Sequence, residues 1–92
     1  MRTDFIKLHI GEALSEVANN YTEEYLDEVV KTNIDQLVKD ITYKLYGYFT
    51  RNEWSSLEDA IYTMLLDEKT LNSIVNVIKG MIVVQSFNFE SK

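Results

Sequence analysis

Apolar residues recur at helical spacing along most of the chain. In the first segment the stripe consists of Ile6, Ile10, Ala13, Leu14, Val17 and Tyr21. Steps of three and four residues place these side chains on one side of a helix, so we predict a helix over residues 4–19. Residues 6–10 also alternate between apolar and polar before Gly11, which is typical of a short strand. The continuation of the stripe beyond Gly11 favours the helix.

The longest apolar pattern predicts one central helix over residues 23–47. Its stripe consists of Leu26, Val30, Ile34, Leu37, Ile41, Leu45 and Tyr48. Three acid-to-lysine pairs one turn apart support it, each by about 0.2–0.5 kcal/mol; they are Asp27–Lys31, Asp35–Lys39 and Asp40–Lys44. Thr22 is suited to cap its start, and Gly47 is suited to end it in a left-handed conformation.

Two further helices are predicted over residues 55–66 and 70–80. Ser55 and Glu58 have the spacing of a capping box, and Gly80 is suited to end the last helix. Residues 81–90 are rich in β-branched and aromatic side chains, which predicts an extended arm or short strand. The sequence therefore predicts a mainly α single domain over residues 1–92. We expect a small four-helix bundle-like fold with one long central helix and a C-terminal extended arm.

Composition narrows the possible functions. The chain of 92 residues has no proline, no cysteine and three glycines, so loops are few and disulfides and thiolate metal sites are excluded. The N-terminus lacks a basic-then-apolar leader, and the longest uninterrupted apolar run, residues 81–84, is too short to span a bilayer. We expect a cytoplasmic protein without a membrane partner.

The charge balance is acidic, with fifteen acidic and nine basic residues and a net charge of −6. This balance disfavours direct nucleic-acid binding. Six carboxylates occur without an intervening base, at Glu12, Glu16, Glu23, Glu24, Asp27 and Glu28. One interpretation is a solvated helix start stabilised by the helix dipole. The other is an acidic face that binds a basic protein partner, in the manner of nucleic-acid phosphates.

Aromatic residues suggest a second surface. Tyr25, Tyr43 and Tyr46 project opposite the apolar stripe of the predicted central helix. Tyrosine is favoured in interfaces, because it combines a large contact area with a polar tip. We expect these tyrosines, with Phe87 and Phe89 of the arm, to form a homodimer interface. The alternative is that the arm covers them within one chain.

No arrangement of residues predicts catalysis, a cofactor or a metal. His9 is the single histidine, and no glycine-rich phosphate loop or paired-ligand spacing is present. We therefore expect a non-enzymatic binding protein. A phage- or plasmid-encoded inhibitor of a nucleic-acid-handling host protein is the leading hypothesis. A winged-helix DNA-binding regulator, with the arm as its wing, and a structural homo-oligomer are the alternatives.

Overall fold

The mainly α prediction is confirmed. The computed structural model describes residues 3–90, and the side-chain surroundings of residues 4–87. The helices are α1 (Thr3–Asn20), α2 (Glu23–Thr32), α3 (Ile34–Leu45), α4 (Trp54–Leu66) and α5 (Glu68–Glu90). Two short 3₁₀ turns, η1 (Tyr46–Tyr48) and η2 (Arg51–Glu53), connect α3 to α4, and residues 3–90 contain no strand.

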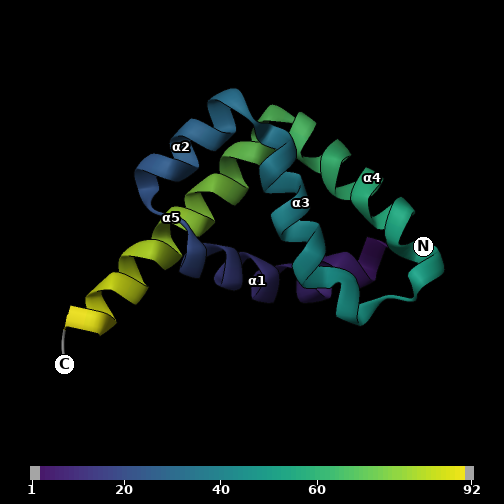
Figure 1. Ribbon diagram of the computed structural model, residues 1–92, viewed down its shortest axis with the longest axis horizontal. Coiled ribbons are helices and arrows are strands. Elements are labelled where there is room, and N and C mark those ends of the chain that lie inside the picture. Colours follow the sequence, from purple (N-terminus) through teal and green to yellow (C-terminus); the bar gives the residue numbers. More distant parts are fainter. Residues whose placement is uncertain (1–2, 91–92) are drawn as a thin grey trace.

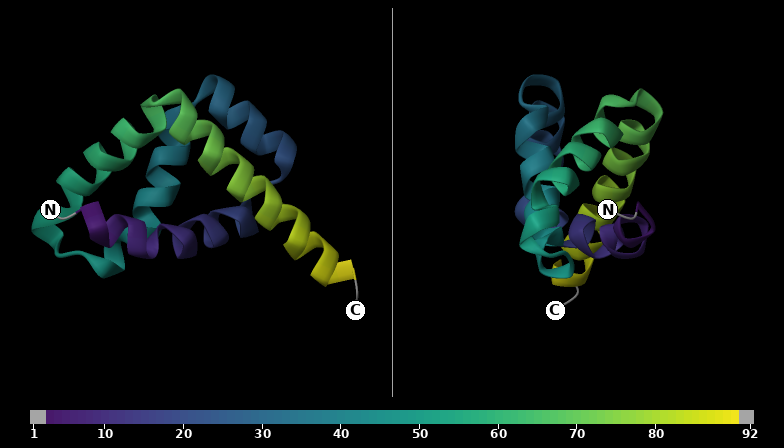
Figure 2. Two further views of the ribbon diagram at one scale, coloured as in Figure 1. Left: turned by 180° about the vertical axis from the view of Figure 1, so that it is seen from behind. Right: turned by 90° about the vertical axis from the view of Figure 1, so that its right-hand side faces the viewer.

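The helices surround α3, which packs against α1, α2 and α4. Helices α1, α4 and α5 form the three sides of a triangle, and α3 crosses it (Figure 1). Seen from behind, α5 lies in front of α3, and its C-terminal turns extend past the other helices (Figure 2). The result is an elongated body with principal extents of 42 × 28 × 18 Å.

The core is built on one face of α3. Leu37, Ile41 and Leu45 are completely buried there, and they share the spacing of four residues that repeats on one side of a helix. The buried apolar residues from the other helices are Ile6, Ala13, Leu14, Val17, Ala18, Leu26, Val29, Leu57, Ile61, Leu65, Ile74 and Ile78. These helical stripes match those seen in the sequence at most positions. The exceptions are Tyr48, which was predicted in the stripe but is exposed, and Val29 and Val38, which lay outside the stripe but are buried.

The predicted central helix over residues 23–47 is wrong, because two helices, α2 and α3, occupy this segment. The chain breaks at Asn33, whose backbone lies outside the helical region at φ −154° and ψ 62°. The Asn33 amide donates to the carbonyl of Val29 at 2.8 Å, which closes α2. The Gln36 amide then donates to the carbonyl of Asn33 at 3.0 Å, which begins α3. Asparagine is a poor helix former, so it tolerates this junction. The turn lets α2 and α3 bury separate faces.

The predicted extended arm, residues 81–90, is also wrong. Helix α5 continues through Gly80, which has no positive φ, and reaches Glu90. Packing overrides the β-propensity of this segment. Ile82 packs against the core, and the side-chain amide of Gln85 donates to the carbonyl of Ser15 on α1 at 3.2 Å. The alternative strand at residues 6–10 is likewise part of a helix, α1.

The connection from α3 to α4 differs from the prediction in its details. Gly47 does not adopt a left-handed conformation but lies inside η1. The capping interactions come earlier than Ser55: the amide and hydroxyl of Thr50 both donate to the carboxylate of Glu53, at 3.0 and 2.9 Å. These hydrogen bonds lower the pKa of Glu53. The chain therefore enters α4 through a hydrogen-bonded turn rather than a glycine hinge.

Thr22 caps α2 as predicted, and this cap can be tested. The Tyr25 amide donates to the Thr22 hydroxyl at 3.0 Å. We predict that Thr22→Ala lowers the free energy of unfolding by about 1 kcal/mol, because the amide loses its acceptor. Thr32→Ala at the other end of α2 is the control, since the Thr32 hydroxyl only bonds back to the carbonyl of Glu28. Urea unfolding of both variants measures the difference; equal losses would contradict the assignment.

Candidate functional site

The acidic residues of α1 contact other helices. The hydroxyl of Tyr48 in η1 donates to the carboxylate of Glu12, which raises the pKa of Tyr48. One turn further along α1, Glu16 forms an ion pair with Lys44 of α3 at 3.3 Å. Lys44 therefore pairs across helices, rather than with Asp40 on its own helix as the sequence suggested. Both carboxylates serve to attach α1 to the rest of the fold.

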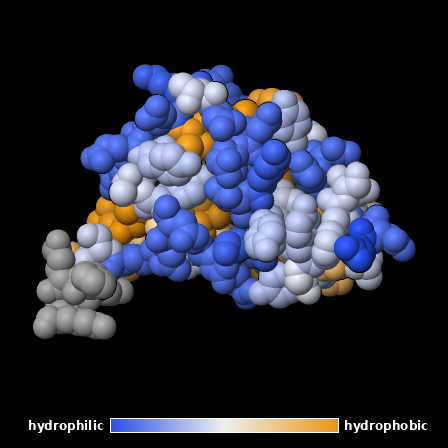
Figure 3. All heavy atoms as spheres, viewed as in Figure 1, coloured by the Kyte–Doolittle hydropathy of each residue, from blue (hydrophilic) through white to orange (hydrophobic). Residues whose placement is uncertain are grey.

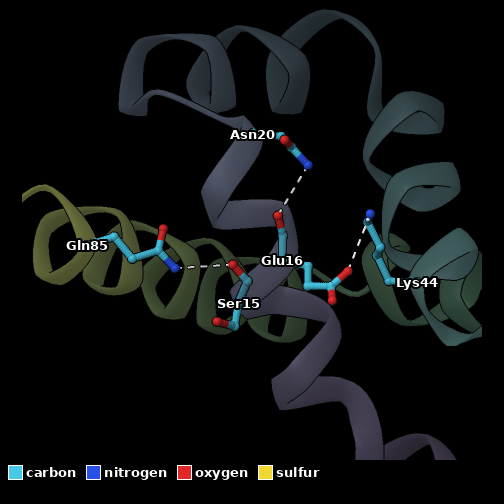
Figure 4. A network of polar contacts seen from close by, with 5 residues as sticks. All are labelled: Ser15, Glu16, Asn20, Lys44 and Gln85. Carbon is cyan, nitrogen blue, oxygen red and sulfur yellow. Dashed lines mark hydrogen bonds and ion pairs between the residues drawn. The ribbon is translucent and has the colours of Figure 1, made fainter. Parts of the chain in front are cut away.

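A polar network around Glu16 ties three helices together (Figure 4). The Asn20 side chain donates to the carbonyl of Glu16 at 3.3 Å, while the carboxylate of the same residue reaches Lys44. The carbonyl of the preceding residue, Ser15, accepts from the side-chain amide of Gln85 on α5. Helix α1 is thus bonded to α3 on one side and to α5 on the other.

The acidic residues of α2 divide into two groups. Asp27 forms an ion pair with Lys79 of α5 at 2.8 Å, and this contact raises the pKa of Lys79. Glu23, Glu24 and Glu28 are exposed, and within the described residues no ion pair joins them to a base. All six carboxylates predicted as one face are on exposed residues; three of them pair with groups of other helices, and three have no such partner within the described residues.

The predicted tyrosine surface does not lie on one helix. Tyr25 is on α2, half-exposed and close to the ring of Tyr21, with ring centroids 4.9 Å apart. Tyr43 is on α3 and 69% exposed, whereas Tyr46 is partly buried in η1, stacked on Trp54 at 4.3 Å. The break at Asn33 separates Tyr25 from the other two. Tyr43 and Tyr46 remain neighbours at the end of α3, with ring centroids 5.8 Å apart, so the interruption of the central helix removes only Tyr25 from the predicted surface.

An aromatic cluster closes the turn between α3 and α4. The indole N–H of Trp54 lies within hydrogen-bonding distance of the carbonyls of Tyr46 and Phe49, at 3.2 and 3.3 Å. The Arg51 guanidinium lies over the Trp54 ring, 5.7 Å from its centroid. Phe49 also contacts Phe5 of α1 edge to face. Most of the aromatic residues near Gly47 therefore serve to hold together the turn between α3 and α4.

His9 lies against this corner. Its ring stacks on Tyr48 with centroids 3.8 Å apart, and its buried Nδ1 has no hydrogen-bond partner. Within residues 3–90, no group of three or more His, Asp or Glu side chains lies close enough to hold a metal ion. His9 is therefore held mainly by ring stacking.

Helix α5 exposes an apolar surface, of which the sequence predicted only Phe87. Hydrophobic residues, coloured orange in Figure 3, gather over the projecting end of α5 beside the grey C-terminal atoms. Val83, Val84 and Phe87 are exposed there, together with Val77 one to two turns earlier. The side chain of Phe89, predicted in the same interface, lies outside the described residues. A helix pattern extended through Gly80 would have revealed this surface.

By length and composition alone, residues Glu68–Phe87 could also cross a membrane. Only 11% of that window is buried in the fold. Ile74 and Ile78 are nevertheless buried in the common core, so an inserted α5 would have to leave it. The search for an uninterrupted apolar run missed this segment, because polar residues are interspersed along it. The expected absence of a membrane partner stays a prediction.

A groove of about 740 Å³ lies between α1 and α4 near the start of α5. Ile6, Ala60 and Met64 give it apolar walls, and Lys7 and Asp59 bring charges of both signs. The sequence pattern could not predict this groove, because its walls come from segments far apart in the chain.

Comparisons with known protein families, with curated proteins and with solved structures find no match to this chain.

Tyr21 provides a pH-dependent test of how α1 is attached to α3. Its hydroxyl donates to the carboxylate of Asp40 at 2.5 Å, and Gln36 donates to the other carboxylate oxygen at 3.1 Å. Burial, reinforced by this hydrogen bond, raises the pKa of Tyr21 well above its usual value. The neutral hydroxyl therefore stabilises the fold below the unfolded pKa of about 10, and this contribution is lost as the pH rises beyond it.

We predict that Tyr21→Phe lowers the free energy of unfolding by about 1 kcal/mol at pH 7. The difference from the unmodified protein should fall by about 1.4 kcal/mol per pH unit above about pH 10, so that near pH 11 the variant is as stable as the unmodified protein or more stable. Urea unfolding at pH 7 and near pH 11 measures it. Tyr62→Phe, at an exposed position on α4, is the control. If the free energies of unfolding of Tyr21→Phe and the unmodified protein differ by the same amount at both pH values, the proposed role of the neutral Tyr21 hydroxyl is contradicted.

Proposed function

We propose that this chain is a non-enzymatic binding protein that contacts a basic protein partner through α2. The observation that supports this most directly is the set of exposed carboxylates at Glu23, Glu24 and Glu28. The helix dipole explains Glu23 and Glu24, which lie in the first turn of α2. It does not explain Glu28, which lies beyond that turn and repels Glu24 four residues earlier. A partner with a basic surface would offset this repulsion.

The narrower form of the proposal concerns the partner. A protein that binds nucleic acid presents a basic surface to phosphates, and a helix carrying exposed carboxylates can occupy such a surface. Lysine outnumbers arginine in this chain and asparagine is frequent, which is typical of AT-rich coding sequences. We therefore propose a phage- or plasmid-encoded inhibitor of a nucleic-acid-handling host protein. Because Glu12, Glu16 and Asp27 pair with other residues of the same chain, we limit the proposed contact surface to the three unpaired carboxylates of α2.

The winged-helix alternative gains no support from the fold. A wing requires a β-hairpin, and residues 81–90, which were to supply it, are part of α5. Helix α4, the counterpart of a recognition helix, carries Glu58 and Asp59 rather than bases. Phosphate contacts are made mainly by basic side chains, so these carboxylates would repel a duplex. We therefore propose a protein partner and not direct DNA binding.

A charge-neutralised variant tests the proposed contact. The triple variant Glu23→Gln, Glu24→Gln, Glu28→Gln removes three negative charges from α2. The control variant Asp35→Asn, Asp59→Asn, Glu68→Gln removes three from exposed positions on α3, α4 and α5. Each protein is immobilised and exposed to bacterial lysate over a series of salt concentrations. We predict that the unmodified chain and the control retain the same host protein, which rising salt releases and the α2 variant does not retain.

Competition with duplex DNA tests whether the partner is a nucleic-acid-handling protein that is bound through its nucleic-acid-binding surface. If the retained protein binds nucleic acid with the same surface, added duplex DNA should prevent its capture. Retention by the α2 variant equal to that of the control would contradict the α2 contact. Retention that is indifferent to DNA would contradict the inhibitor mechanism but not the binding role.

A further inference from the structure

The solvent-facing side of α5 is apolar over its C-terminal half. We call this surface the outer ridge; it consists of Val77, Gly80, Val83, Val84 and Phe87. At about 100° per residue, these positions lie on the opposite side of α5 from Leu71, Ile78 and Ile82, which pack into the core. Exposure is 45% at Val77, 52% at Val83, 58% at Val84 and 70% at Phe87. The helix therefore has two apolar faces, and the fold covers one of them.

The charge distribution indicates what covers the other face. Between Glu68 and Glu90, α5 carries no carboxylate and only two bases, and one of these, Lys79, is paired with Asp27. Depletion of charge on an exposed surface is the signature of an interface core. A basic partner would be drawn to acidic surfaces instead, and a helix lying on an anionic membrane carries several bases on its polar face. Two copies with a net charge of −6 repel each other wherever carboxylates meet. At the outer ridge, two copies can approach each other without bringing their carboxylates together.

The shape of the outer ridge is complementary to itself. Gly80 and Phe87 are seven residues apart, close to two helical turns, so they lie on the same side of α5. A Cβ atom at Gly80 would meet nothing within 4 Å, so this position is a notch open to solvent. Phe87 is the largest side chain of the ridge and Gly80 the smallest. Val83 and Val84 lie midway between them.

We propose that two copies of this chain form a dimer through their outer ridges, with the two α5 helices antiparallel. The two-fold axis passes between Val83 and Val84, so that Phe87 of each copy fills the notch at Gly80 of the other. The interface is isologous, because each such contact occurs twice. The proposal does not rest on the proposed function, since it involves a different face and a different partner.

Single-cysteine cross-linking tests the register, because the chain has no cysteine of its own. In the antiparallel pair, the two copies of residue 84 are separated along the helices by one residue, about 1.5 Å. The two copies of residue 77 are separated by thirteen residues, roughly 20 Å. Treated with a bis-maleimide whose reach is about one helix diameter, ~10 Å, Val84→Cys should yield a covalent dimer and Val77→Cys should not. Equal cross-linking of both variants would overturn the antiparallel arrangement.

Sedimentation analysis of the full chain tests the interface itself. The unmodified protein should sediment with the mass of two chains. Val84→Glu places an unpaired charge at the two-fold axis and should weaken dimerisation at least about tenfold. Leu8→Glu, an exposed apolar position on α1, is the matched control and should remain dimeric. A monomeric unmodified protein, or a Val84→Glu variant as dimeric as the control, would overturn the proposal.

Discussion

The burial of one face of α3 between α1 and α4 is the interaction on which the rest of this structure depends. Leu37, Ile41 and Leu45 are fully buried, and every other helix is positioned by direct contact with this face or with a neighbour of it. In a chain of 92 residues, the stability margin is small and no disulfide supplements it. The break at Asn33 follows from the same requirement, because α2 must turn away from the axis of α3 to bury its own apolar side chains.

This arrangement assigns different roles to residues that look alike in the sequence. Of six neighbouring carboxylates, Glu12, Glu16 and Asp27 attach helices to one another, whereas the remaining three on α2 face solvent. The aromatic residues divide in the same way. Trp54 and its neighbours close the turn into α4. Helix α5 is bound through one face only, so the outer ridge stays exposed, and it is this surface that we propose to bind a second copy.

Much of the fold was predictable from the sequence, because helical periodicity depends only on the spacing of apolar residues. The pattern placed four of the five helix starts within about two residues, a typical uncertainty for helix ends, and identified most residues of the core, but not Val29 and Val38. It failed at Asn33, since a one-residue break hardly disturbs a helical projection. It failed at residues 81–90, where packing against α1 overrides β-propensity. The division of the acidic residues depends on contacts between distant segments, such as Asp27 with Lys79, which periodicity does not encode.

Hydrogen exchange of α5 at several protein concentrations reports both on the helix itself and on the contact made by its outer ridge. We predict that amides in residues 80–87 are protected, and that their protection increases with protein concentration while that of α4 does not. Protection of residues 80–87 that is independent of concentration would contradict the dimer. Rapid exchange throughout this segment at every concentration would contradict the helix itself.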